Sequence, residues 1–323
     1  MNMFRENFLC NFHCCSYYDQ ASLLLKYLDE SYKEALYSLS GDCFLDKVKL
    51  DYSNPFGNQF CFRIFGFGSI NGILCLHDYD NYGPIVLWNP TNQEIKPIPP
   101  SPVESVSLCI PDVFKDYVNV FSPYYLHGFG HDSIHLDELW EIYNLKNNSW
   151  RKLDIDMPSS LHCMVGTQLY MNGVCHWLCE ENSPSGLCLL SFYLSNEAFF
   201  ITPIPSDEDD CFKFKASWIN LVVLNGYISL ITFHEVTNNF HIAILDKFGV
   251  KGSWTKLFII GPFSFIERPI GVGTKGEIFF QRKDRELVLF DLSTQMIEEL
   301  GYKARDISTQ IIIYKEIIHA MEE

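Results

Sequence analysis

Ile70-Asn-Gly-Ile-Leu-Cys-Leu76 places an Asn-Gly pair directly before a run of apolar residues. The same pair recurs at Asn172-Gly173 and Asn225-Gly226, and Lys275-Gly276 takes a similar position further on. A tight type I′ hairpin turn needs positive φ at both of its central residues, and Asn and Gly adopt that conformation at low cost. The repeated pair therefore predicts a series of antiparallel hairpins spread along the chain.

Short apolar runs rich in β-branched and aromatic residues lie between these turns, and Gly, Pro, Asn and Asp separate them. Runs of this kind, with the usual strand length of about 5–6 residues, are typical of β-strands. The clearest are Cys61 to Phe67, Gly72 to Leu76, Ile85 to Trp88, Gly173 to Leu178, Leu187 to Tyr193, Tyr227 to Phe233, His241 to Leu245, Glu277 to Phe280 and Leu287 to Phe290.

The stretch from Gln20 to Leu39 is rich in Leu, Lys, Glu and Ala, so it also fits a helix. It divides, however, into Ser22 to Tyr27 and Glu34 to Leu39 around a polar Asp-Glu-Ser turn. We therefore expect two strands there. The apolar, β-branched run Gln310 to Ile318 predicts a further strand near the C-terminus.

A second strand follows each hairpin turn and ends in Leu-Trp-Asn-Pro (87–90), Phe-Tyr-Leu-Ser (192–195), Ile-Leu-Asp-Lys (244–247) or Phe-Asp-Leu-Ser (290–293). Repetition of hairpin, strand and aromatic residue is typical of propeller blades. Blades of about 40–50 residues would give roughly six to eight in this chain. The sequence thus predicts an all-β fold, a β-propeller-like array of short antiparallel sheets, with a β-sandwich as the alternative.

Composition excludes several classes of function. Lys plus Arg number 24 and Asp plus Glu number 40, so the formal charge is 24 − 40 = −16. A phosphate backbone would be repelled by that balance, and we expect no nucleic-acid partner. The sequence contains no apolar run of the roughly 18 residues that a membrane helix needs, so we expect no membrane partner.

The 12 cysteines are scattered from Cys10 to Cys211, and no secretory signal opens the chain. A chain of 323 residues can also build a core without disulfides. We therefore expect reduced, mostly buried thiols in a cytoplasmic or nuclear protein.

Three histidines, His127, His131 and His135, have the spacing of metal ligands on a helix. Gly128 and Gly130 disfavour that helix, and no Cys or carboxylate lies at a diagnostic distance along the chain. We expect no metal site.

Cys175 and Cys179, like Cys10 and Cys14, are separated by three residues rather than the two of zinc or redox motifs. His176 follows Cys175, but neighbours on a strand point to opposite faces, so a Cys-His nucleophile is not expected. Other nucleophile, nucleotide and metalloprotease motifs do not occur in the sequence. The glycine-rich stretch 66–72 precedes a strand, so a β-turn explains it better than a phosphate site does. We expect no catalytic residue, no cofactor and no enzyme activity.

The acidic run Asp207-Glu-Asp-Asp210 follows two prolines. It is interpreted as a solvated loop between blades, or alternatively as a loop that contacts a basic partner surface.

Six segments, in order, resemble the F-box-associated domain of plant F-box proteins. They are Gly68-Ser-Ile-Asn-Gly-Ile-Leu-Cys-Leu76, Val86-Leu-Trp-Asn-Pro-Thr-Asn92 with Ile98-Pro-Pro, His127-Gly-Phe-Gly-His-Asp132 with Glu141-Ile-Tyr-Asn-Leu145 and Asn148-Ser-Trp-Arg-Lys152, Tyr170-Met-Asn-Gly-Val-Cys-His-Trp177, Leu190-Ser-Phe-Tyr-Leu-Ser-Asn-Glu197, and Leu224-Asn-Gly226 with Ser253-Trp-Thr-Lys256. The resemblance implies a kelch-like β domain over residues 21–318, a linker-like segment at 1–20 and a tail at 319–323.

The resemblance also implies a function. Such a domain is the substrate-recognition part of an SCF (Skp1-cullin-F-box) ubiquitin ligase and binds a target protein. The N-terminal F-box motif is missing from this sequence, so Skp1 and cullin are expected partners only if an F-box lies upstream. The alternatives are a truncated, non-ligase paralogue that only binds the target, and a propeller enzyme or lectin. Neither the target nor the residues that bind it are identified by the sequence.

Overall fold

The computed structural model describes only part of the chain. The described residues are 21–31, 33–41, 44, 46–50, 54, 56, 62–64, 68–69, 71–78, 85–99, 110–114, 117–123, 140–145, 147–153, 161–181, 186–205, 219–250, 252–305 and 308–316. Across these ranges no helix has the length and apolar character required to cross a bilayer.

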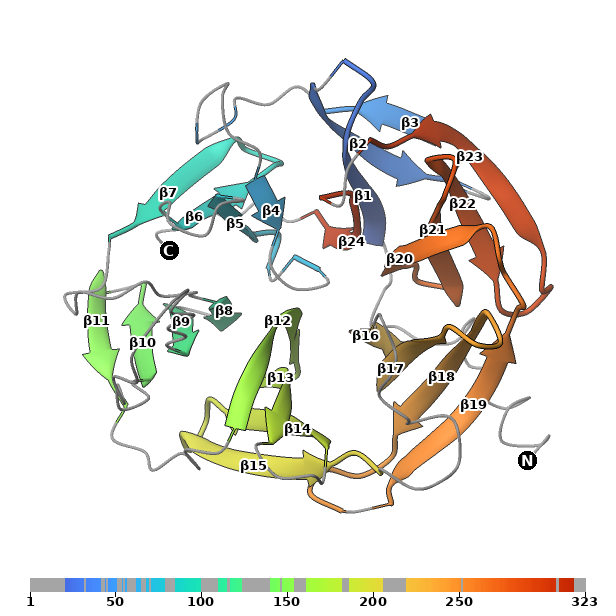
Figure 1. Ribbon diagram of the computed structural model, residues 1–323. Coiled ribbons are helices and arrows are strands. Elements are labelled where there is room, and N and C mark those ends of the chain that lie inside the picture. The colour runs from blue at the N-terminus through green and yellow to red at the C-terminus, as the bar shows by residue number, and fades with distance from the viewer. Residues whose placement is uncertain are drawn as a thin grey trace, which may run out of the picture.

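The described strands form six four-stranded antiparallel sheets arranged in a ring (Figure 1). The predicted class, an all-β propeller of short antiparallel sheets, is confirmed, and the sandwich alternative is wrong. The sequence predicted roughly six to eight blades, and the described residues contain six four-stranded sheets. From the inner to the outer strand, the sheets are β24 (Gln310–Lys315), β1 (Ala21–Leu28), β2 (Glu34–Ser40) and β3 (Asp46–Lys49); β4 (Phe62–Ile64), β5 (Leu74–Asp78), β6 (Ile85–Asn89) and β7 (Glu94–Ile98); β8 (Ile110–Phe114), β9 (Tyr117–Pro123), β10 (Trp140–Asn144) and β11 (Ser149–Lys152); β12 (Leu161–Met171), β13 (Val174–Glu181), β14 (Leu187–Tyr193) and β15 (Ala198–Pro203); β16 (Ile219–Leu224), β17 (Tyr227–His234), β18 (Asn239–Leu245) and β19 (Trp254–Ile260); β20 (Ile266–Val272), β21 (Glu277–Arg282), β22 (Glu286–Asp291) and β23 (Ile297–Lys303).

The ring is closed by strands from the two ends of the described chain. β24 pairs antiparallel with β1, with Leu24 opposite Ile312, and thereby becomes the inner strand of the first sheet (Figure 1). Gly68 forms a parallel bridge to Ile313 on the other side of β24. The first sheet therefore combines a strand from the C-terminal end of the described chain with three from its N-terminal end.

The hydrophobic core is divided among the interfaces between neighbouring sheets. Six buried clusters are present in the described residues, and each joins two consecutive sheets of the ring. Both faces of a sheet are therefore covered, which explains why β6 and β14 read as almost continuous apolar runs rather than as alternating ones. Full burial of each Leu, Ile or Phe side chain stabilises the fold by roughly 1.5–3 kcal/mol.

The predicted Asn-Gly turns are confirmed. Asn71, Asn172 and Asn225 have φ of 50°, 52° and 49°, and the glycines that follow them have φ of 76°, 80° and 76°. At Lys275-Gly276 only the glycine has positive φ, 94°. Strands predicted to begin at Gly72 and Gly173 begin at Leu74 and Val174, because each glycine is part of its turn.

The ambiguous stretch after Gln20 is a hairpin rather than a helix. β1 and β2 pair antiparallel, with Lys26 opposite Leu36. Asp29 organises the turn through its carboxylate, which accepts the N–H groups of Ser31 at 2.8 Å and Lys33 at 2.9 Å. The prediction of two strands is confirmed. The C-terminal run is also a strand, β24, which ends at Lys315.

Candidate functional site

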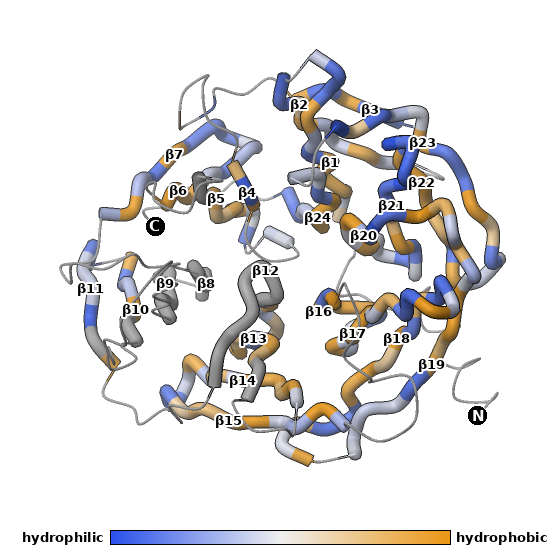
Figure 2. The backbone as a smooth tube through the Cα atoms, in the orientation of Figure 1, coloured by the Kyte–Doolittle hydropathy of each residue, from blue (hydrophilic) through white to orange (hydrophobic). Residues whose placement is uncertain are grey.

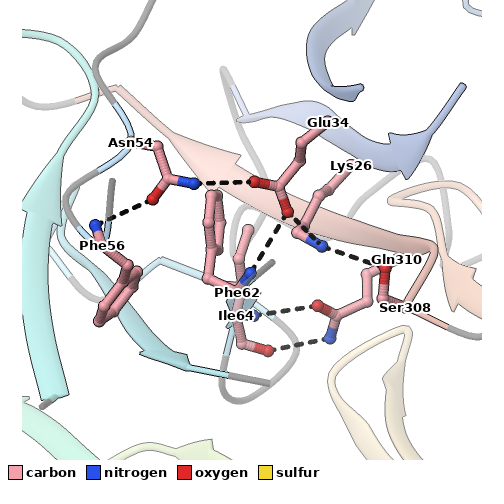
Figure 3. A network of polar contacts seen from close by, with 8 residues as sticks. All are labelled: Lys26, Glu34, Asn54, Phe56, Phe62, Ile64, Ser308 and Gln310. Atoms are coloured by element: carbon pink, nitrogen blue, oxygen red, sulfur yellow. Dashed lines mark hydrogen bonds and ion pairs between the residues drawn. The ribbon is translucent and has the colours of Figure 1, made fainter. Parts of the chain in front are cut away.

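A buried ion pair lies where the two ends of the ring meet (Figure 3). Lys26 on β1 is fully buried, and its Nζ lies 2.9 Å from Oε1 of Glu34 on β2, whose side chain is 9% exposed. The same ammonium donates to Oγ of Ser308 at 3.3 Å and lies 5.0 Å from the centre of the Phe62 ring. A charge this deeply buried is tolerated only when it is paired and hydrogen-bonded.

Glu34 extends the network to the segment between β3 and β4 (Figure 3). Its carboxylate accepts the side-chain amide of Asn54 and the backbone N–H of Phe62, each at 3.4 Å. Asn54 in turn accepts the N–H of Phe56 at 2.9 Å. The carboxylate thus connects the first sheet to the entry into the second.

Gln310 on β24 completes the network from the C-terminal side. Its Oε1 accepts the N–H of Ile64 at 3.0 Å, and its Nε2 donates to the carbonyl of Ile64 at 2.9 Å. Figure 3 shows this amide facing β4 across the junction. A side chain here supplies the pair of bonds that a neighbouring strand would otherwise provide.

The chemistry of this network is structural. The Lys26 ammonium is held between a carboxylate, a hydroxyl and an aromatic face, and it has no exposed surface. A nucleophilic or substrate-binding amine must be reachable, and this one is enclosed. The network therefore fastens the first sheet, including its inner strand β24, to the second sheet. Sequence reasoning did not single out Lys26, although one charge inside the apolar run Leu-Leu-Leu-Lys-Tyr-Leu (23–28) is a signal for such a pair.

His176 on β13 is a second buried polar group. Its side chain is fully buried, and Nδ1 lies 2.9 Å from Oγ of Ser191 on β14. The ring stacks on Phe248 from the β18–β19 turn, with 5.3 Å between ring centres and 10° between planes. Burial lowers the pKa of His176 to about 3, so the imidazole is neutral at physiological pH.

Cys175 and His176 point to opposite faces of their sheet, as predicted. Cys175, Cys179 and Trp177 belong to the cluster between the third and fourth sheets, whereas His176 meets Phe248 from the fifth. Four cysteines whose side chains are described, Cys75, Cys175, Cys179 and Cys188, are buried thiols, which confirms the prediction for these four. No cysteine–histidine nucleophile is formed at this position.

Several predicted candidates lie outside the described residues. They are His127, His131, His135, Cys10, Cys14 and the acidic run Asp207–Asp210. In the ranges that are described, no three His, Cys, Asp or Glu side chains gather closely enough to hold a metal ion. In the glycine-rich stretch, Gly68 bridges to β24 and Asn71-Gly72 forms a turn, so the described part of that stretch has a structural role.

Exposed apolar side chains lie on β15 of the fourth sheet and in the β18–β19 turn of the fifth. On β15, Phe200 is 46% exposed and Ile201 is 38% exposed. In the β18–β19 turn, Phe248 and Val250 are exposed by 38% and 49%. The turn is fastened to β15 by the Gly249 N–H, which donates to Oγ1 of Thr202 at 2.7 Å. Large exposed apolar groups on a rigid framework are typical of protein-binding surfaces.

Comparison with known proteins gives one family. Residues 43–320 match the family model of the F-box associated beta propeller domain. A probable F-box protein of Arabidopsis thaliana is 24% identical over 214 residues, which cover 61% of this chain and 48% of that protein. The chain thus matches about half the length of this curated relative.

Solved structures with similar folds include enzymes. Dipeptidyl peptidase 4 of Porphyromonas gingivalis superposes with a TM-score of 0.40 and 10% identity, over 84% of this chain and 42% of that one. A DUF4784 family protein from Bacteroides caccae gives a TM-score of 0.45 and 11% identity, over 90% of this chain and 73% of that one. Likeness at this level does not bear on activity.

Proposed function

The chain belongs to the F-box associated β-propeller family, and on that premise we propose that it is a protein-interaction module rather than an enzyme. Its role is that of the substrate-recognition part of an SCF ubiquitin ligase, acting in the cytoplasm or nucleus. The observation that carries the proposal is the family match over residues 43–320. The relation to a probable F-box protein of Arabidopsis thaliana supports the same role.

The mechanism is positioning. Six sheets packed face to face through buried clusters form a rigid ring, and the Lys26–Glu34 network fastens its closure. A rigid scaffold lets its exposed segments hold a partner without first losing conformational entropy. Skp1 and cullin would be recruited by an F-box, which would bring the bound target to the ubiquitin-charged enzyme.

A pair of tagged proteins tests the proposal in plant cells. One is this chain alone, and the other is this chain joined to an F-box from another member of the family. We expect both to capture the same target, but only the fusion to capture Skp1 and cullin and to increase ubiquitination of the target. A target that is captured by both but never ubiquitinated would indicate a binding protein without a ligase role. No shared target at all would overturn the proposal.

A further inference from the structure

Outer strands of a propeller are sheet edges, and an unprotected edge can pair with another chain. Charged side chains are a common protection against such pairing. Five of the six outer strands carry at least one: Asp46, Lys47 and Lys49 on β3, Glu94 and Lys96 on β7, Arg151 and Lys152 on β11, Lys256 on β19, and Glu298, Glu299 and Lys303 on β23.

β15 is the exception. Its sequence, Ala-Phe-Phe-Ile-Thr-Pro, contains no charged residue, and its centre is coloured as hydrophobic in Figure 2. Its single protective residue is Pro203, at the last position of the strand. Phe200 and Ile201 are exposed by 46% and 38%, and as neighbours on a strand they point to opposite faces of the sheet. An added strand would cover both.

The direction of the backbone groups on β15 follows from one hydrogen bond. Just beyond the strand, the Ile204 N–H donates to the carbonyl of Leu187 at 3.0 Å. Residues of an antiparallel ladder alternate between facing the partner strand and facing away. Thr202 and Phe200 therefore direct their backbone groups toward β14, while Ile201 directs its N–H and C=O outward. Within the described part of the chain, β15 has a strand partner on one side only.

We propose that the β15 edge binds an extended segment of a partner protein that has apolar residues at alternate positions and basic residues at its flanks. The proposal rests on the function proposed above and specifies how the target is held. Hydrogen bonds to the outward-directed N–H and C=O of Ile201 would supply affinity. Contacts with the side chains of Phe200 and Ile201 would supply selectivity.

Charge decides between the possible occupants. The chain carries a net charge of −16, so two copies repel each other, while a segment with Lys or Arg flanks is attracted. Glu197, immediately before β15, carries a negative charge near the edge and pairs with Arg151 on β11. A basic partner segment is therefore favoured over a second copy of this chain.

The probe is a short fluorescent peptide of alternating valine and threonine with paired lysines at both ends, titrated with the whole chain. We expect saturable binding that weakens at least tenfold, or about 1.4 kcal/mol, when the lysines are replaced by glutamates. N-methylation of the central amides should abolish binding, because it removes the donors that pair with the edge. A lysine-flanked peptide that does not saturate, or an N-methylated peptide that binds equally well, overturns the proposal.

Two matched variants locate the site. Ile201→Lys adds a charge to β15, and Ile259→Lys adds the same charge at an exposed position, 52% exposed, on the outer strand β19. We expect at least a tenfold loss of peptide binding for Ile201→Lys and no change for Ile259→Lys, with equal melting temperatures. Equal binding by Ile201→Lys would overturn the proposal. So would a dimer in light scattering that Ile201→Lys dissociates, since the edge would then bind a second copy.

Failure of this inference and failure of the proposed function give different results. If both the unaltered chain and Ile201→Lys capture the target of the ligase experiment equally, the edge is not the target site and the proposed function stands. If the peptide binds at β15 but no target is captured, the edge is a binding site and the ligase role is wrong.

Discussion

The side-chain amide of Gln310 hydrogen-bonds both backbone groups of Ile64, the N–H at 3.0 Å and the carbonyl at 2.9 Å. Gln310 lies on β24, the inner strand of the first sheet, and Ile64 lies on β4, the inner strand of the second sheet. One side chain therefore connects two sheets through a pair of residues that are 246 positions apart in the sequence.

Replacement of Gln310 by Leu should loosen this junction. Ile64 would keep a buried N–H and carbonyl without these partners, and an unsatisfied buried group costs roughly 1–3 kcal/mol. Gln310→Glu should be milder, because a carboxylate can still accept the N–H of Ile64. The measurement is amide hydrogen exchange at Ile64 together with the melting temperature. Unchanged exchange in Gln310→Leu would show that the junction is held by other contacts.

The buried Lys26–Glu34 pair should be sensitive to loss of either partner. Lys26→Met leaves the Glu34 carboxylate buried without its counter-charge, and breaking such a pair typically costs about 3–5 kcal/mol. The matched control is Arg151→Met, which removes the exposed pair with Glu197, whose side chains are 52% and 40% exposed. Exposed pairs contribute about 0–1 kcal/mol. Urea unfolding of the two variants should differ accordingly.

The double variant Lys26→Met/Glu34→Met separates pairing from packing. If the cost of Lys26→Met comes from an uncompensated carboxylate, removal of that carboxylate should recover much of it. A double variant as unstable as the sum of the single ones would mean that the two side chains act independently.

The strands were predictable because local chemistry decides them, whereas the contacts between sheets were not. Asn172-Gly173 predicts its own hairpin, since both residues adopt positive φ without help from the rest of the fold. By contrast, Lys26 meets Ser308 across 282 positions, and no local pattern specifies that distance. His176 was assigned correctly to the face opposite Cys175, but its stacking on Phe248 depends on how the fourth and fifth sheets pack.

Gly271 should be essential where β20 passes β24. A Cβ added at this position would lie 2.3 Å from the carbonyl oxygen of Ile311, a backbone atom that cannot move aside. Gly271→Ala should therefore destabilise the fold by about 3 kcal/mol, the upper end of the usual cost of overpacking. At Gly301, with φ of +72°, a Cβ meets nothing within 4 Å. Gly301→Ala should cost only the roughly 1 kcal/mol of a left-handed backbone. Equal melting temperatures for the two variants would contradict this contact.

The buried imidazole of His176 should make stability depend on pH. Burial lowers its pKa from 6.5 to about 3 in the folded state. Below pH 6.5 the unfolded chain binds a proton that the folded chain excludes, so the stability due to this group is complete above 6.5 and is lost as pH falls toward 3. The loss should reach roughly 2 kcal/mol by about pH 5, at 1.36 kcal/mol per pH unit. Urea unfolding at a series of pH values measures it. His176→Gln retains a group that can bond to Ser191 but cannot titrate, so its stability should change less across this range. A variant with the same pH dependence as the unaltered chain would assign the effect to other groups.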